Sequence, residues 1–419
     1  MKKSQARVIL HDSRAVTREL WIALQRACSV SEANVKSKRA TGGGDKWYHP
    51  RLWHSMNASA WWRMFAANGF RASPHRWATV VSIAGLTAFN SFLGLVQAIT
   101  HGARVAKTPI TDDPIFIIGH WRSGTTHLHD LLSLDERFAY PTTYQCFAPQ
   151  HFLLTERLFP KMFPWMLPEK RPMDNMAVGF DRPQEDEFAL VALGLKSPYW
   201  SMAYPNRPQC EKYLRMKEVG PAARQKWKTV FGKLLRRLTY RYGGKPIIFK
   251  SPTHTARVEL LAEMFPGAKF LHIVRDPHTL FASTVNLWRK VYTVHGMEKP
   301  NFEGLEDYVF RTLIEMYTGF DEAQAQLPAG QFHQVHYEDL ATEPLRTLED
   351  SYAALNLGGF ADVKPRLEQY LAGLRDYKAN QYELSESIRR TISEKWGPIF
   401  RPWGYEVAEA PQEAAAAAD

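Results

Sequence analysis

A strand-loop-helix segment at residues 114–126 constrains this chain more than any other feature. Its sequence is Pro-Ile-Phe-Ile-Ile-Gly-His-Trp-Arg-Ser-Gly-Thr-Thr, an apolar run of β character followed by a loop between two glycines. Leu128, Leu131 and Leu132 follow at helical spacing and would form one buried face. A strand that turns into a helix in this way presents backbone N–H groups and the positive end of a helix dipole. The segment therefore predicts a site for an anion.

The spacing of the loop is that of a nucleotide-binding P-loop, because four residues separate Gly119 from Gly124. Thr125 stands where ATPases and kinases carry the lysine that contacts the β- and γ-phosphates. Arg122 supplies the cation of the loop instead. The loop thus predicts a bound anion other than ATP.

Apolar β segments alternate with helical segments from residue 114 onward, which predicts an α/β fold with a parallel, doubly wound sheet. We expect strands at residues 115–119, 247–250, 269–274 and 334–337. We expect helices at residues 124–134, 255–265 and 277–290, and another after Pro344. Ligands of such sheets bind at the carboxyl ends of the strands.

Composition divides the rest of the chain into segments around this α/β domain, which we place at residues 111–405. Residues 140–245 lack the alternation, and we interpret them as an insertion that builds the acceptor side of the cleft. The other segments are a polar basic stretch, an aromatic and basic helical extension, and a low-complexity tail expected to be disordered, at residues 1–45, 46–110 and 406–419.

The net charge of +10 is concentrated near the N-terminus, where residues 1–110 hold 16 Lys and Arg against 4 Asp and Glu. No acidic residue lies between Asp45 and Asp112. Segregated positive charge favours a polyanionic partner. An anionic membrane surface with tryptophans at the interface would satisfy this pattern, and so would tryptophans packed in the core. We expect no nucleic acid partner, because no recognised binding module frames the basic residues.

Residues 77–100 carry no charge and are long enough to cross a bilayer, although Gly85, Gly94 and several polar residues interrupt them. Three structures remain open: a membrane-spanning helix, a buried or hairpin-like pair of helices covering the core, and an element at the membrane interface. The three cysteines lie far apart, which indicates a reducing compartment, and no apolar signal-peptide stretch follows Met1. We predict a cytoplasmic protein, either free or peripheral on the inner face of the membrane.

A second candidate phosphate site follows the predicted strand at residues 269–274. Arg275 comes directly after this strand, Pro277 suits the start of a helix, and Ser283 lies two turns into that helix. A guanidinium at the carboxyl edge of the sheet can bind a phosphate through two hydrogen bonds. Taken alone, an arginine-aspartate turn beside a buried helix serine is the simpler interpretation.

In their order along the chain, these motifs resemble those of the sulfotransferases that use 3′-phosphoadenosine-5′-phosphosulfate (PAPS). In that family an Arg/Lys-Ser-Gly-Thr-Thr loop binds the 5′-phosphosulfate, and an arginine followed eight residues later by a serine binds the 3′-phosphate. Residues 122–126 match the first motif, and Arg275 with Ser283 matches the second. Residues 249–254, 265–270 and 335–340 also look like the bacterial and tyrosylprotein branches. The resemblance covers about residues 114–345 and implies the three-layer, P-loop-like fold of these enzymes.

The resemblance also implies which residues bind the donor. They are His120, Trp121, Arg122, Ser123, Gly124, Thr125, Thr126, Arg275, Ser283 and Tyr337. We add Arg389 and Arg390, because sulfotransferases often place a basic segment over the adenine and the 3′-phosphate. An ordinary exposed basic helix face would give the same pattern near the C-terminus.

Sulfuryl transfer is an in-line displacement in which negative charge builds on the bridging oxygen of the leaving phosphate. Fixed cations and amides at that oxygen lower the barrier. Arg122 and Lys250 are our candidates, and Lys250 matches the residue that stabilises the transferring group in the tyrosylprotein branch. We expect no metal, since the sulfuryl group carries less charge than a phosphoryl group.

A general base should accept the proton of the acceptor hydroxyl. In the tyrosylprotein branch a glutamate lies shortly after the phosphosulfate helix, where this chain has Gln145, which cannot act as a base. Carboxylates follow Pro183 in the first turn of a predicted helix. We choose Glu185 as the base, Asp186 as the second candidate and His254 as the third. Stabilisation of a helix dipole would also place acids there.

The sequence thus predicts a PAPS-dependent sulfotransferase that produces a sulfate ester and adenosine 3′,5′-bisphosphate. The acceptor hydroxyl belongs to a small alcohol or to a lipid-like alcohol. A P-loop kinase or NTPase is the alternative enzyme. A membrane-associated nucleotide-binding protein without activity is the alternative that Gln145 leaves open.

Overall fold

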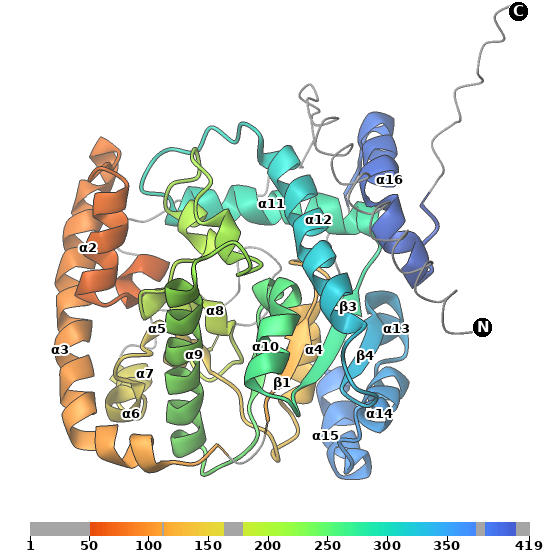
Figure 1. The fold of residues 1–419 in the computed structure, drawn as a ribbon, viewed down its shortest axis with the longest axis horizontal. Helices are drawn as coiled ribbons and strands as arrows, with labels where there is room; N and C mark the ends of the chain where they lie inside the picture. The colour runs from red at the N-terminus through yellow and green to blue at the C-terminus, as the bar shows by residue number, and fades with distance from the viewer. Residues whose placement is uncertain (1–50, 111–112, 163–178, 374–381, 408–419) are drawn as a thin grey trace, which may run out of the picture.

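The computed structural model describes residues 51–110, 113–162, 179–373 and 382–407 (Figure 1). Within these ranges a sheet of four parallel strands runs in the order β2-β1-β3-β4. The strands are β1 (Ile115–Ile118), β2 (Ile248–Lys250), β3 (Lys269–Val274) and β4 (Phe332–His336). Phe116 of the central strand β1 pairs with Phe249 on one side and Phe270 on the other. The predicted parallel sheet is confirmed, and β3 has its predicted bounds.

Side chains of β1 alternate between two apolar cores, one on each face of the sheet. Phe116 and Ile118 belong to the larger core, together with α9 (Pro221–Arg241), α10 (Val258–Met264), α11 (Pro277–His295), α12 (Leu305–Gln324) and α16 (Glu386–Phe400). Ile115 and Ile117 belong to the smaller core, together with α4 (Thr125–Leu132), α13 (Tyr337–Thr342), α14 (Pro344–Ala354) and α15 (Phe360–Ala372). Helices therefore cover both faces, and the three-layer prediction is confirmed.

The described part of the insertion at residues 140–245 contains helices joined by turns and loops, and it has no strand of the sheet. It contains α5 (Thr143–Phe147), α6 (Phe152–Thr155), α7 (Phe159–Met162), α8 (Asp186–Ala192), the 3₁₀ helices η4 (Pro198–Met202) and η5 (Glu211–Tyr213), and α9. The helix expected from residue 255 begins later, because residues Pro252–Arg257 form the 3₁₀ helix η6 ahead of α10. The polar basic segment 1–45 and residues 408–419 of the tail lie outside the described residues.

The aromatic and basic extension is helical as expected. It consists of η1 (Leu52–Ser55), α2 (Ala58–Ala67), η2 (Pro74–Arg76) and α3 (Trp77–Lys107). The expectation of a hairpin-like pair of helices over residues 77–100 is wrong, because α3 is one continuous helix of 31 residues. It runs along one outer edge of the molecule, at the opposite side from α13–α15 (Figure 1). Trp53 and Trp61 are buried in the core, whereas Trp62 and Trp77 are 46% and 48% exposed.

Helix α3 buries several polar side chains against the protein and exposes a row of apolar side chains on its opposite face. Asn90 Nδ2 donates to the carbonyls of His54 at 2.8 Å and Met56 at 3.0 Å. Gln97 Nε2 donates to the carbonyl of Gln150 at 2.7 Å. The outward side chains are between 51% and 75% exposed; they are Val81, Phe89, Phe92, Leu95 and Ile99. We call this set the outer face of α3.

Candidate active site

The loop after β1 has the backbone geometry of an anion cradle. Gly119 (φ 146°), Arg122 (φ 72°) and Gly124 (φ 106°) all adopt positive φ, so the chain reverses within a few residues. A Cβ at Gly119 would lie 2.4 Å from the carbonyl oxygen of Ile273, so only glycine fits there. In α4 the first intrahelical hydrogen bond is donated by Leu128 to the carbonyl of Gly124, at 3.1 Å. The amides of residues 125–127 precede that bond, and amides in the first turn of a helix can donate to an anion.

Two of the predicted phosphate-binding residues are brought together with Arg122. Arg122 Nε donates to Ser283 Oγ at 2.9 Å. Arg275 Nη1 donates to the carbonyl oxygen of Arg122 at 3.0 Å, and its guanidinium lies over the Tyr337 ring, 4.1 Å from the centroid. Residues far apart in the sequence thus form one cationic cluster at the carboxyl edge of the sheet.

The side chains of His120 and Ser123 are used within the loop itself. Ser123 Oγ donates to the carbonyl oxygen of His120 at 2.8 Å and is fully buried. His120 Nδ1 lies 2.9 Å from the carbonyl oxygen of Trp121. Burial lowers the pKa of His120 to about 4 despite that hydrogen bond, so the ring is neutral near pH 7. The side chains of both residues thus make hydrogen bonds within the loop, and their binding of the donor stays a prediction.

Lys250 and Glu185 meet beside the start of α4. Lys250 ends β2, and its Nζ lies 2.9 Å from Glu185 Oε1 and 3.5 Å from Thr126 Oγ1. The Lys250 side chain is 1% exposed and that of Glu185 is 12% exposed. Glu185 occupies the N-cap position of α8, which begins a few residues after Pro183, and its carboxylate is directed to Lys250 and not to the helix amides. A cation and a carboxylate therefore stand next to the predicted phosphosulfate cradle.

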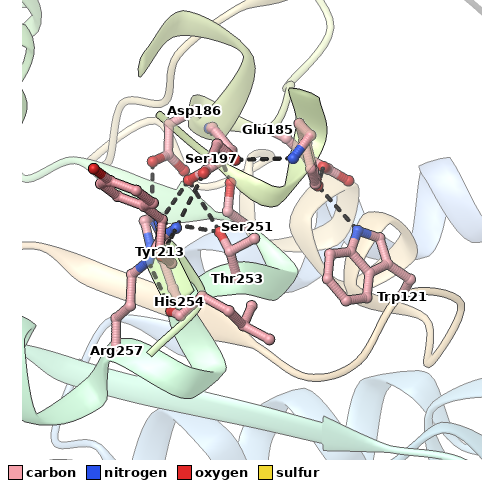
Figure 2. Close-up of polar contacts among 12 residues, drawn as sticks. Trp121, Glu185, Asp186, Ser197, Tyr213, Ser251, Thr253, His254 and Arg257 are labelled. Carbon is pink, nitrogen blue, oxygen red and sulfur yellow. Dashed lines mark hydrogen bonds and ion pairs between the residues drawn. The ribbon is translucent and has the colours of Figure 1, made fainter. Parts of the chain in front are cut away.

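Asp186 and His254 do not face this cradle. Asp186 Oδ2 lies 2.7 Å from His254 Nε2, and both side chains are fully buried. In Figure 2 this pair lies on the other side of Glu185 from Trp121. Their geometry is that of a pair that anchors α8 to η6, and it argues against either residue as the base.

A second buried ion pair supports the same junction. Arg257 Nη1 donates to Glu187 Oε2 at 2.6 Å, and Thr253 Oγ1 donates to the same oxygen at 3.0 Å. Burial raises the pKa of Glu187, but the charge and hydrogen bonds of Arg257 outweigh it and lower the pKa overall. These contacts fix the first turn of α8 to η6. They thereby position Glu185, which directly precedes α8.

Gln145 has a structural role in place of the expected base. Its Oε1 accepts from the amide of Thr142 at 3.1 Å and so caps α5. Its Nε2 donates to Glu156 Oε2 at 2.9 Å and to the hydroxyl of Tyr242 at 3.0 Å. The amide side chain is therefore engaged within the insertion.

Arg389 and Arg390 are exposed in the first turns of α16, and Arg390 lies 3.8 Å from Glu386 of the same helix. Within the described ranges no hydrogen bond or ion pair joins either arginine to the loop. Farther along α16, Trp396 reaches the loop, with its ring 6.3 Å from that of His120. Binding of the donor by the two arginines stays a prediction.

Sequence reasoning missed Tyr199. Its hydroxyl donates to Glu185 Oε2 at 2.6 Å and accepts from Trp121 Nε1 at 3.0 Å. Trp121, predicted to bind the donor, turns its indole N–H toward Tyr199. No local pattern marks Tyr199, because it lies in a short 3₁₀ helix and meets Glu185 only in the folded chain.

Comparison with known proteins identifies the class. A model of the sulfotransferase family matches residues 114–362, and the chain belongs to this family. The fold agrees with solved sulfotransferases: STF9 from Mycobacterium avium has a TM-score of 0.63 at 18% identity, covering 81% of this chain and 88% of that one. STF1 from Mycobacterium tuberculosis H37Rv has a TM-score of 0.54 at 18% identity, covering 75% and 83%. The predicted sulfotransferase is confirmed, and the kinase and the inactive binding protein are set aside.

Two relatives of higher sequence identity have a more specific name. The omega-hydroxy-beta-dihydromenaquinone-9 sulfotransferases Stf3 of Mycobacterium bovis and of Mycobacterium tuberculosis are each 43% identical to this chain over 375 residues. The match covers 89% of this chain and 96% of each relative. It therefore includes the aromatic and basic extension as well as the catalytic domain.

Proposed function

We propose that this sulfotransferase moves a sulfuryl group from PAPS to a terminal hydroxyl of an isoprenoid quinol or a similar membrane lipid. The names of the 43% identical relatives support this acceptor class. The single observation that carries the catalytic assignment is the contact of Lys250 with both Glu185 and Thr126, at 2.9 and 3.5 Å. It joins a cation, a carboxylate and the start of α4 at one point.

The donor set fits a nucleotide with phosphates at both ends. The amides at the start of α4 and the Arg122 guanidinium suit the 5′-phosphosulfate, and Arg275 with Ser283 suits the 3′-phosphate. Within the described ranges no group of three or more His, Cys, Asp or Glu side chains could hold a metal ion. We propose that the amides at the start of α4 and the nearby cationic side chains stabilise the leaving phosphate.

In the proposed step the acceptor oxygen attacks the sulfur atom while the bond from sulfur to the bridging phosphate oxygen breaks. Glu185 takes the proton of the acceptor hydroxyl. Lys250 and Arg122 stabilise the charge that develops on the bridging oxygen, which leaves with adenosine 3′,5′-bisphosphate. The products are that nucleotide, the sulfate ester and a protonated Glu185, which returns its proton to water.

The outer face of α3 supports access to a membrane acceptor. By length and composition residues Pro74–Lys107 could cross a membrane, which by itself is weak support. Because Asn90 and Gln97 bond α3 to the protein, we propose that it lies along the bilayer surface with its outer face toward the lipid. Nearby basic residues would face anionic headgroups; they are Arg63, Arg71, Arg104 and Lys107. The inner, cytoplasmic face of the membrane is our proposed location.

The catalytic assignment is tested with Glu185→Gln. Loss of the base should lower kcat by about 10²–10⁴-fold. The affinity for adenosine 3′,5′-bisphosphate, measured by calorimetry, should stay within about twofold, because the nucleotide site does not use this carboxylate. Glu136→Gln, at an exposed ion pair with Arg366, is the matched control. Near-normal turnover of Glu185→Gln would remove Glu185 from the mechanism.

The acceptor is tested by transfer of labelled sulfate from PAPS. An isoprenoid quinol with a terminal hydroxyl, presented in vesicles, should have a kcat/KM well above that of a short-chain alcohol. Equal kcat/KM values for the two would contradict a lipid acceptor. No transfer to any hydroxyl would contradict PAPS as the donor.

A further inference from the structure

A chain of hydrogen bonds links the donor loop to the proposed base. Trp121, between the two loop glycines, donates through Nε1 to the hydroxyl of Tyr199 at 3.0 Å. That hydroxyl donates onward to Glu185 Oε2 at 2.6 Å, and Glu185 Oε1 accepts from Lys250 at 2.9 Å. Each oxygen of the carboxylate thus has its own donor, and one of these donors leads back to the loop.

Tyr199 is held in place by aromatic rings on three sides. Its ring centroid lies 5.5 Å from that of Phe188, 6.2 Å from that of Trp121 and 6.4 Å from that of Trp288. The side chain is 1% exposed. Burial and the neighbouring carboxylate of Glu185 raise the pKa of Tyr199 well above its usual value. The hydroxyl therefore stays protonated and can only donate to Glu185 in the working pH range.

We propose that Tyr199 is a positioning residue that orients the Glu185 carboxylate toward the acceptor hydroxyl and couples it to the donor loop through Trp121. The inference rests on the proposed role of Glu185 as the base. Lys250 can move toward the sulfuryl group when the donor binds, since it already lies near Thr126. Tyr199 then remains as the fixed hydrogen-bond donor to the carboxylate and keeps it oriented.

The surroundings of Glu185 define which groups can affect its titration. The charged and titratable neighbours are Lys250 of β2, Tyr199 of η4, Cys146 of α5, and the buried pair of Asp186 with His254. Lys250 and Tyr199 donate directly to its carboxylate oxygens. Removing the tyrosine hydroxyl therefore changes the pH dependence of catalysis without changing the aromatic cage.

The test is Tyr199→Phe, which keeps the ring and removes the donor. We expect kcat to fall about tenfold or more, because a hydrogen bond to a charged group is lost. The acidic limb of kcat against pH should move upward by about one pH unit. The affinity for adenosine 3′,5′-bisphosphate should not change. Trp121→Phe should give a smaller shift in the same direction.

Tyr204→Phe is the matched control, because Tyr204 is also fully buried and donates to the carbonyl of Arg71 at 3.2 Å, away from Glu185. It should leave the pH profile unchanged. In the Glu185→Gln background, Tyr199→Phe should have no further effect on kcat, since both act through one carboxylate. An unshifted profile, or an equal loss in both backgrounds, would overturn the positioning role. Near-normal turnover of Glu185→Gln alone would instead overturn the proposed base.

Discussion

The carboxyl edge of the sheet and the outer face of α3 place polar and apolar groups in opposite ways. At the sheet edge, charged side chains such as Lys250 are buried, and each has a partner of fixed geometry. On α3, polar side chains such as Asn90 are buried, whereas the apolar side chains of the outer face are exposed. Buried charges need partners, and exposed apolar surface favours a non-aqueous phase. Under the proposed function, the first region binds the anionic donor and the second faces lipid.

Of the three changes predicted here, the largest is the loss of turnover when a cation at the sheet edge is removed. Arg122→Ala should lower kcat by about 10²–10³-fold, because a fixed cation at the leaving phosphate is lost. Binding to anionic vesicles should be unchanged, which separates the two regions. Arg346→Ala, at a side chain that is 76% exposed, is the control. Steady-state assays of sulfate transfer provide the measurement, and turnover near that of the unaltered protein would exclude Arg122 from catalysis.

A somewhat smaller change is expected in membrane binding when the outer face of α3 is altered. Replacing Phe92 and Ile99 together by serine should weaken binding to phosphatidylglycerol vesicles by about a hundredfold, since both side chains leave the lipid. The residues are 62% and 75% exposed, so the fold should tolerate the change. Vesicle sedimentation measures the affinity, and transfer to a short-chain alcohol should be unaffected. Unchanged vesicle binding would show that the outer face of α3 does not meet the membrane.

The smallest effect concerns acid stability of the sheet. Burial lowers the pKa of His272 on β3 to about 3, against its ordinary 6.5. Between these values the unfolded chain binds the proton and the folded chain does not, so the free energy of unfolding falls as the pH falls below 6.5. From pH 6.5 to pH 5 we expect His272 to contribute a loss of about 2 kcal/mol.

Denaturant unfolding of His272→Gln should show a correspondingly weaker dependence on pH, whatever its stability at pH 7. The exposed His75, replaced by Gln, should leave the dependence as it is. Equal pH dependence for His272→Gln and the unaltered protein would contradict this account.

The parts of the site predicted from sequence are those that a local pattern carries. The glycines at 119 and 124 mark a tight turn, and Arg275 follows a strand of clear β character. Parallel strands bring the loop and Arg275 to the same edge of the sheet. The hydrogen bonds from Arg275 to the carbonyl oxygen of Arg122 and from Arg122 to Ser283 confirm that these residues lie close together. The choice among Glu185, Asp186 and His254 had no such pattern, because acids at a helix start look alike in sequence.

For α3, by contrast, the sequence pattern did not distinguish between the possible structures. Its uncharged run is equally compatible with a buried hairpin, a span and a surface helix. Asn90 and Gln97, which dilute the apolar run, are the residues that attach the helix to the protein. Which side of a helix is inside depends on its neighbours, and these come from residues far away in the chain.

The sequence by itself determined the α/β class, the tight loop after β1 and the two arginines at the sheet edge, because short-range spacing controls strands, turns and helix starts. Only the tertiary structure decided that Glu185 meets Lys250, that Asp186 pairs with His254, and that Tyr199 connects Trp121 to the carboxylate. Such contacts are made between side chains whose distance along the chain is unrelated to their distance in space.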